Sequence, residues 1–263
     1  TLTLLLAYRA LPADRRGTQP ERTRFDHAGT LLLALTLAAY ALAMTMGRGS
    51  FGALNGALLI AALAGAGLFV LAEARATSPL VRLEMFRNPV LSAGFAMSAL
   101  VTTVVMATLV VGPFYLSGAL GLDAAFAGLV MSAGPIVAAL TGVPAGRLVD
   151  RLGAHRMTMA GLIGMAAGSA ILPMVPAKVG IPGYIVPLAV ITAGYALFQA
   201  ANNTAVMADL RPDQRGVGSG ILNLSRNLGL ITGAPVMGTL FALGSATTNV
   251  MAARPEAVAA GMR

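Results

Sequence analysis

Long apolar stretches recur along this chain and constrain its fold more than any other feature. Seven of them are about 19 to 28 residues long, enough for a helix to cross the ~30 Å hydrocarbon core of a bilayer. Only the last contains a charged residue, Arg226. The stretches are 28–46, 53–72, 90–117, 124–145, 157–177, 184–206 and 216–243. They predict an all-α, polytopic membrane protein.

The composition excludes an ordinary soluble domain. Hydrophobic residues make up 57% of the 263 positions and charged residues only 11%, whereas a soluble domain carries roughly 25% charged residues. So few charges cannot coat the surface that a large aqueous core would leave exposed. The chain has no cysteine, which excludes disulfides, thiolate metal sites and cysteine nucleophiles.

The basic residues predict an orientation. Thirteen of the eighteen lie in one alternating set of connections, four lie in the other set, and Arg226 is the last. Because Lys and Arg near span ends are retained in the cytoplasm, the first set is predicted to be cytoplasmic. Eight of the ten acidic residues fall in the same connections, and none lies clearly within a span. The net charge of +8 therefore indicates topology and no nucleic acid partner.

The most specific local pattern is Gly-Arg-Leu-Val-Asp-Arg-Leu-Gly-Ala-His-Arg at 146–156, in the predicted loop between the fourth and fifth spans. Its glycines permit a tight turn, and its aspartate can accept hydrogen bonds from nearby guanidinium groups. Such a loop can hold two helices together in one state and release them in another. The alternative is an ordinary positive-inside turn. The candidate gating residues are Gly146, Asp150, Arg151, Gly153 and Arg156.

This pattern resembles a loop signature of the major facilitator superfamily. Three further stretches resemble the fourteen-span drug/proton antiporters of that superfamily, the EmrB/QacA-like group. They are Arg-Phe-Asp-His-Ala-Gly from Arg24, Ser-Pro-Leu-Val-Arg-Leu-Glu-Met-Phe-Arg-Asn from Ser78, and Arg-Gly-Val-Gly-Ser-Gly-Ile-Leu-Asn-Leu-Ser-Arg-Asn-Leu-Gly from Arg215. The four stretches occur in the family's order, and the resemblance covers essentially the whole chain.

The resemblance implies a division of the chain and a C-terminal fragment of a longer transporter. The expected segments are the end of the sixth membrane helix (1–10), a cytoplasmic central loop (11–27), two additional membrane helices (28–77), a cytoplasmic linker (78–89), five helices of the C-terminal bundle (90–243) and an extracytoplasmic loop (244–263). The last helix and the N-terminal bundle, with the membrane acid that the family uses for proton coupling, would be missing.

Two rows of polar residues are candidates for the lining of a central cavity. Polar side chains facing lipid are costly, so both rows are expected to face the bundle interior. Arg226 lies roughly 15 Å into its helix, and we expect it to pair with a carboxylate of the missing half or with substrate. The alternative is interhelical hydrogen bonding that only holds the bundle together. The candidates are Thr192, Tyr195, Gln199, Asn202, Asn203, Ser219, Asn223, Arg226 and Asn227.

The seventh span also carries small residues at helical spacing. Glycines four residues apart form a face that lets two helices approach closely, and a proline bends a helix. The pattern resembles the Gly-x-x-x-Gly-Pro motif of antiporters, although packing alone explains it equally well. The residues are Gly229, Gly233, Pro235 and Gly238.

These features together predict a membrane transporter and no enzyme. The sequence lacks a Gly-x-x-x-x-Gly-Lys-Ser/Thr loop, which argues against ATP-driven transport. The resemblance implies proton-coupled efflux of amphipathic drugs or antibiotics by alternating access, with no cofactor beyond the proton gradient. The implied partners are the lipid bilayer of a bacterial cell membrane, protons, a small amphipathic substrate and the N-terminal bundle. The alternatives are a non-transporting remnant or scaffold, and a metabolite or siderophore exporter.

Overall fold

Helices make up nearly all of the chain that is described. The computed structural model describes Arg9 and residues 26–46, 52–76 and 78–244, and this part contains no strand. The α-helices are α2 (His27–Thr45), α3 (Ala53–Arg75), α4 (Pro89–Gly118), α5 (Ala124–Met131), α6 (Ala133–Leu152), α7 (Ala154–Ile171), α8 (Ile181–Ala208) and α9 (Arg215–Gly244). Short 3-10 turns are η1 (Leu83–Arg87), η2 (Leu172–Met174), η3 (Ala177–Val179) and η4 (Pro212–Gln214).

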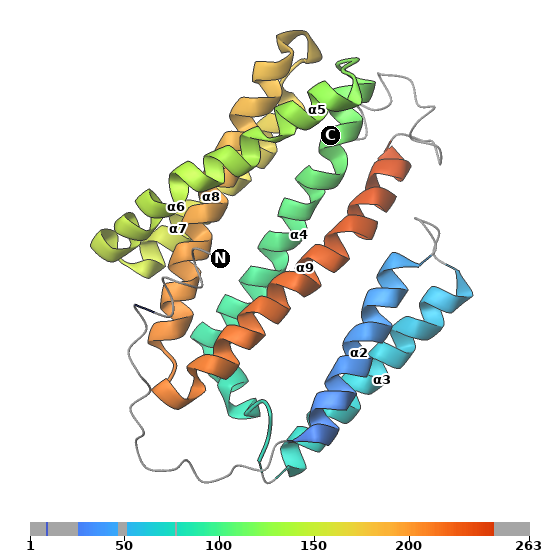
Figure 1. The fold of residues 1–263 in the computed structure, drawn as a ribbon, viewed down its shortest axis with the longest axis vertical. Coiled ribbons are helices and arrows are strands. Elements are labelled where there is room, and N and C mark those ends of the chain that lie inside the picture. The colour runs from blue at the N-terminus through green and yellow to red at the C-terminus, as the bar shows by residue number, and fades with distance from the viewer. Residues whose placement is uncertain (1–8, 10–25, 47–51, 77, 245–263) are drawn as a thin grey trace.

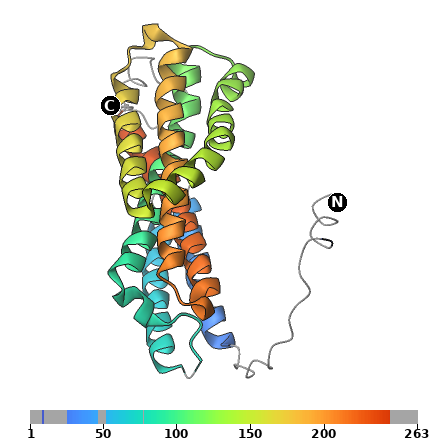
Figure 2. The same cartoon turned by 90° about the vertical axis from the view of Figure 1, so that its left-hand side faces the viewer.

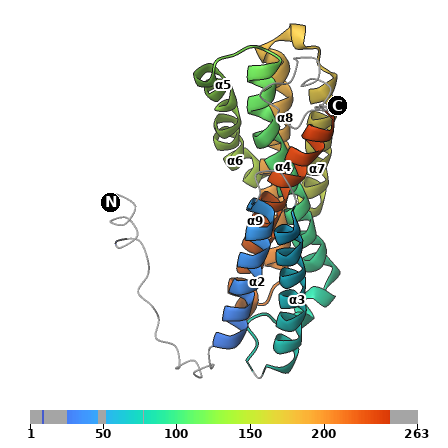
Figure 3. The ribbon, with the colours of Figure 1, turned by 90° about the vertical axis from the view of Figure 1, so that its right-hand side faces the viewer.

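The helices pack side by side in pairs. The most extensive contacts are those of α7 with α8, α4 with α9 and α2 with α3, and α6 also packs along α8. The α4–α9 pair lies between the α6–α7–α8 group and the α2–α3 hairpin (Figure 1). The group and the hairpin face the viewer in Figures 2 and 3, respectively. The chain therefore forms a layered helical array with the α4–α9 pair at its centre.

The α2–α3 hairpin is fastened at both ends by polar side chains. Asp26 caps the start of α2 by accepting from the Gly29 N–H at 2.8 Å. At the turn, buried Asn55 donates to the carbonyl of Ala43 at 2.7 Å and accepts from the Gly52 N–H at 3.1 Å. These bonds satisfy backbone groups that helix ends leave without partners.

Exposed apolar side chains cover the outside of the described helices. Leu63, Leu140 and Ile163 expose 73%, 71% and 63% of their surfaces, which a soluble protein would bury. Within the described residues, six helical segments are long and apolar enough to cross a membrane. They are α2, α3, α4, α5 with α6, α7 with η2, and α8. The predicted all-α membrane fold is confirmed.

In two of the predicted spans, the α-helix is interrupted or ends near a proline. The stretch 124–145 contains two helices separated at Ser132, because Pro135 has no N–H to donate to the Met131 carbonyl. The stretch 157–177 ends its α-helix at Ile171 and continues as a 3-10 turn containing Pro173. The seventh predicted span is helical as α9, but α9 is not among the six apolar segments.

The proposed helix end at 1–10, the central loop at 11–27 and the outer segment at 244–263 lie almost entirely outside the described residues. The predicted linker at 78–89 contains η1 and leads directly into α4.

Candidate functional site

An apolar pocket of about 240 Å³ lies between α4, α6 and α8. Its walls include Leu109, Met131 and Leu188, and its polar atoms come from a few hydroxyl-bearing residues. Two of these, Thr192 and Tyr195, belong to the first predicted polar row, and Gln199 is half-buried one turn further along α8. An apolar lining with a small number of placed polar groups is typical of sites for amphipathic small molecules.

A second pocket, of about 190 Å³, adjoins the first on the side of α7 and α9. Both pockets are lined by Thr108, Tyr184 and Ile191. The Tyr184 hydroxyl and the Ser169 hydroxyl are buried and make no hydrogen bond within the described chain. Because an unsatisfied buried hydroxyl is costly, these two groups are a polar weak point of this part of the described structure.

Tyr184 is held in place by close packing. Its ring stacks on that of Tyr115 with centroids 6.0 Å apart and planes 25° apart. Its hydroxyl lies against Gly112, where a Cβ would overlap it. The sequence analysis missed Tyr184 because it begins a predicted span and belongs to neither polar row. The nearby Gly112-Pro113 pair was the signal that could have pointed to it.

Arg226 has a partner within the chain. Its guanidinium donates to Asn203 Oδ1 on α8, and it is close enough to Tyr195 to interact with it electrostatically. The expected partner, a carboxylate of the missing half or the substrate, lies outside the described chain, and within that chain the acceptor is a neutral amide. This contact arises because α8 and α9 pack together on the side that Asn203 faces.

Asn202 is a packing residue in this structure and does not line the predicted cavity. It is 2% exposed, and its amide donates to the Gly94 carbonyl at 3.0 Å and to Ser98 Oγ at 2.9 Å. Both acceptors lie on α4. The next residue, Asn203, contacts α9 instead, because successive residues of a helix point about 100° apart.

The remaining polar residues of the second row lie on the surface of the described chain. Ser219 is exposed and donates to the Gly216 carbonyl of its own helix at 2.8 Å. Asn227 donates to both the carbonyl and the amide oxygen of exposed Asn223, at 2.9 and 3.1 Å. None of these bonds joins α9 to another helix, so the face stays open for contact with other groups.

Gly229 and Gly233 lie where α4 and α9 approach each other most closely. A Cβ on Gly229 would overlap the Ala99 carbonyl, and one on Gly233 would lie 2.7 Å from the Thr103 carbonyl. Across the same contact Thr102 donates to the Arg226 carbonyl at 3.0 Å and Thr103 to the Gly229 carbonyl at 3.2 Å.

The other two residues of this motif, Pro235 and Gly238, are not described at the close contact between α4 and α9. Pro235 lies within α9 and removes one backbone donor from it. A Cβ on Gly238 would meet nothing within 4 Å in the described structure.

The 146–156 pattern is helical except at one residue. Gly153, with φ of +88° and ψ of 146°, is the single residue between α6 and α7, whereas Gly146 lies inside α6 in open space. The expected loop is thus reduced to a one-residue joint. Asp150, Arg151 and Arg156 are exposed, and they form no ion pair with one another or with other described residues.

A buried carboxylate lies at the end of the hairpin that precedes the linker. Glu73 is 3% exposed; its Oε2 accepts from the Val81 N–H at 3.1 Å, while its Oε1 has no hydrogen-bond partner in the described structure. Its Oε1 and Asp26 Oδ2 both lie against Gly29. The sequence analysis assigned Glu73 to a connection because the apolar stretch ends at Ala72. Within the described residues, no three metal-ligating side chains come together.

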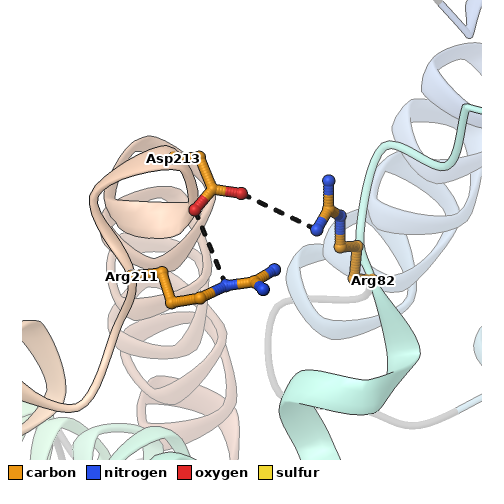
Figure 4. Close-up of polar contacts among 3 residues, drawn as sticks. All are labelled: Arg82, Arg211 and Asp213. Atoms are coloured by element: carbon orange, nitrogen blue, oxygen red, sulfur yellow. Dashed lines mark ion pairs between the residues drawn. The ribbon is translucent and has the colours of Figure 1, made fainter.

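Polar contacts join the linker to the α8–α9 connection. Arg82 pairs with Asp213 at 3.7 Å, and Asp213 pairs also with Arg211 at 3.6 Å (Figure 4). Asn88, which caps the start of α4, donates to Asp209 at the end of α8. All of these groups lie among the connections predicted to be cytoplasmic.

The sequence matches known transporters over most of its length. The family model for the Major Facilitator Superfamily matches residues 25–234. The chain is 29% identical over 237 residues to the uncharacterized transporter YebQ of Escherichia coli (strain K12), covering 90% of this chain and 51% of that protein. It is 32% identical over 239 residues to the drug efflux pump JefA of Mycobacterium tuberculosis (strain ATCC 25618 / H37Rv), covering 89% of this chain and 47% of the pump.

A third relative is the riboflavin transporter RibZ of Clostridioides difficile (strain 630). It is 28% identical over 175 residues, covering 66% of this chain and 38% of that transporter. The chain thus spans about half the length of the first two relatives and less of the third. The extent of the family match, together with the apolar helical segments, assigns the chain to a class of transporters and not of enzymes. The chain belongs to the major facilitator superfamily.

Proposed function

We propose that this chain is part of a secondary active exporter that expels amphipathic drugs or antibiotics in exchange for protons. The observation that carries the proposal is the apolar pocket between α4, α6 and α8, in which Thr108, Thr192 and Tyr195 supply the polar groups. Such a pocket binds molecules that combine an apolar body with a few polar groups. The similarity to a drug efflux pump supports the same class of substrate.

The proposed cycle needs a second bundle. In alternating access, two bundles rock around a site near the membrane midplane, and each contributes part of that site. The described helices provide one side, with the open polar face of α9 directed at the other. The proton-binding carboxylate belongs, in this proposal, to the N-terminal bundle of the full-length transporter in a bacterial cell membrane. The energy comes from the proton gradient, and no cofactor takes part.

Arg226 and the α6–α7 joint have distinct roles in this scheme. The described partner of Arg226 is a neutral amide that leaves its charge uncompensated, so that charge attracts a carboxylate of the opposite bundle or an anionic group of the substrate. The exposed Asp150, Arg151 and Arg156 beside Gly153 form the gating contacts with the opposite bundle, since they have no ion pair within the described chain. A transport-dead Asp150→Ala variant that still folds would agree with this role.

A metabolite exporter is a second candidate, and the similarity to a riboflavin transporter favours it. The same pocket would accept a planar aromatic metabolite. Because such a substrate carries polar edges, its export should depend strongly on the residues that supply hydroxyl groups to this pocket, Thr108, Thr192 and Tyr195.

Efflux from cells or everted vesicles containing the full-length protein tests the proposal. We expect efflux of a fluorescent lipophilic cation that stops when a protonophore removes the gradient. Thr192→Val removes one pocket hydroxyl without changing side-chain shape and should raise KM about fivefold, the effect of losing roughly 1 kcal/mol. Thr204→Val, on an exposed part of α8, is the matched control.

Each other outcome has a defined meaning. Efflux that continues at the same rate after the protonophore is added would contradict proton coupling. Transport of flavins but not of lipophilic cations would select the metabolite exporter. A well-expressed protein that transports none of these compounds would favour the non-transporting scaffold.

A further inference from the structure

The span that contains α5 and α6 is divided at one residue, beside the pocket between α4, α6 and α8. Ser132 lies between the two helices, and its N–H donates to the carbonyls of Gly128 and Leu129 at 3.1 and 3.2 Å. Its hydroxyl donates to the Leu129 carbonyl at 2.6 Å. Pro135 has no N–H for the Met131 carbonyl, so the bond that would continue the helix there is missing. Ser132 thus supplies local partners that keep the span divided.

A proline by itself does not divide a helix of this chain. Pro113 of α4, Pro144 of α6, Pro187 of α8 and Pro235 of α9 all lie inside continuous helices. Bends of more than about 20° occur mainly where a proline or an inserted group interrupts the backbone bonds. The α5–α6 joint combines a proline with such an interruption, whereas Pro144, in the same span, lies within regular helix.

The two parts of the span are held by different neighbours. α5 packs mainly on α4, and its Ala127 and Val130 belong to an apolar cluster shared with α4 and α8. α6 packs along α8, but in the described structure it buries only two of its residues, Ala145 and Val149. The short helix is thus fixed at one end of the bundle, and the long helix is held less firmly.

The joint lies at the pocket, and the far end of α6 carries charges. Met131, Gly134 and Pro135 form part of the pocket wall. Asp150 and Arg151 lie at the predicted cytoplasmic end of α6, about 27 Å from the joint at 1.5 Å per residue. A bend of about 10° at the joint therefore moves these charges by about 5 Å. The joint is placed where a small change in the pocket produces a large movement at the charged end.

We infer that the α5–α6 joint is a hinge that couples the pocket to the charged end of α6, with Gly134 and Pro135 as positioning residues. A molecule in the pocket presses on α6 and tilts it away from α4, which moves Asp150 and Arg151. No ion pair within the described chain opposes this movement, since these two residues form none there. The inference rests on the proposed function for the identity of the occupant, an amphipathic molecule.

The distance between two spin labels in the purified full-length protein, otherwise free of cysteine, tests the hinge. One label replaces exposed Val90 at the start of α4, and the other replaces exposed Leu148 of α6. Pulsed electron paramagnetic resonance measures the distribution of this distance. Pro135→Ala restores the missing N–H and should narrow the distribution. Pro144→Ala, the matched control in the same span, should leave it unchanged.

A side chain that fills the pocket tests the coupling without any ligand. Ala138 of α6 lines the pocket, whereas its exposed neighbour Ala139 does not. Ala138→Phe imitates an occupied pocket and should lengthen the distance between the labels by about 4 Å, which is the displacement of Leu148 for a bend of about 10°. Ala139→Phe should leave the distance unchanged. Adding Pro135→Ala to Ala138→Phe should remove most of the shift.

Several results would overturn the inference. They are a distribution that Pro135→Ala leaves unchanged, equal narrowing by Pro135→Ala and Pro144→Ala, equal shifts with Ala138→Phe and Ala139→Phe, and a shift that persists in full when Pro135→Ala is added. None of these measurements involves transport or a drug. A failure of the hinge can therefore be distinguished from a failure of the proposed exporter function.

Discussion

At the scale of single residues, Arg226 shows how the fold accommodates a charge within a long helix. Its guanidinium donates to Asn203 Oδ1, and its carbonyl accepts from Thr102 of α4. A charge at the bilayer centre costs at least about 2.5 kcal/mol unless it faces the protein interior or water. The neutral amide lowers that cost without cancelling the charge, so Arg226 keeps its attraction for anionic groups.

Asn203→Ala tests this contact directly. Loss of the acceptor leaves the half-buried guanidinium without its described partner and should lower the free energy of unfolding by about 1–3 kcal/mol. Denaturant titration of the purified protein in detergent measures the change. Asn223→Ala removes an exposed amide that bonds only within α9 and should have little effect. Equal stability of the two variants would argue against a stabilising role for Asn203.

At the scale of helices, the two closest contacts are made by glycines that face backbone. Gly229 and Gly233 let α9 lie against carbonyls of α4, and Gly161 lies 2.6 Å, measured from an added Cβ, from the Phe198 nitrogen of α8. At such contacts backbone cannot move aside as a flexible side chain can. The pairing of α4 with α9 and of α7 with α8 therefore depends on having no side chain at a few positions.

Gly229→Ala should separate α4 from α9. The added methyl overlaps the Ala99 carbonyl and Thr102 Oγ1, and relief of that overlap should cost about 1–3 kcal/mol and lower Tm. Gly220→Ala, between two and three turns earlier on α9, meets nothing within 4 Å in the described structure and should be neutral or slightly stabilising. A Gly229→Ala protein as stable as Gly220→Ala would contradict the close approach.

The α6–α7 joint makes a second helix-scale prediction. Gly153 has φ of +88° and ψ of 146°, a region that side chains disfavour by about 1–3 kcal/mol, so Gly153→Ala should destabilise the protein by that amount. Gly146→Ala is helical and uncrowded and should stabilise it by up to about 1 kcal/mol. Thermal unfolding of both variants measures the difference. Similar effects at both positions would indicate that Gly153 adopts a different backbone conformation in solution.

At the scale of the whole molecule, apolar stretches predict which segments are helices but not how each helix is rotated. The run at 184–206 becomes α8, yet its adjacent residues Asn202 and Asn203 contact different helices. Periodicity identifies a polar face and cannot identify the neighbour that the face meets. Glu73 was missed for a related reason: its burial comes from the opposing α2 and the linker, which no local window includes.

The predicted orientation of the molecule can be measured because the chain contains no cysteine. In a full-length protein otherwise free of cysteine, Pro212→Cys in η4 should react with an impermeant maleimide only from the cytoplasmic side. Lys178→Cys in η3 should react only from the outside, since the two turns lie at opposite ends of α8. Both positions are exposed. Labelling of both from the same side would contradict the predicted topology.

The contact between α4 and α9 has a mechanical consequence. Thr102 and Thr103 of α4 donate hydrogen bonds to two carbonyls of α9. Gly229 and Gly233 allow the backbones of the two helices to pack directly against each other. If α9 slid along α4, each glycine would move away from the backbone that it packs against, and both hydrogen bonds would break. The two helices are therefore expected to move together as a rigid pair. The contacts of α4 with α8 are less extensive. Movement of this pair relative to the α6–α7–α8 group should therefore occur where α4 meets α8, beside the pockets at Thr108 and Tyr184.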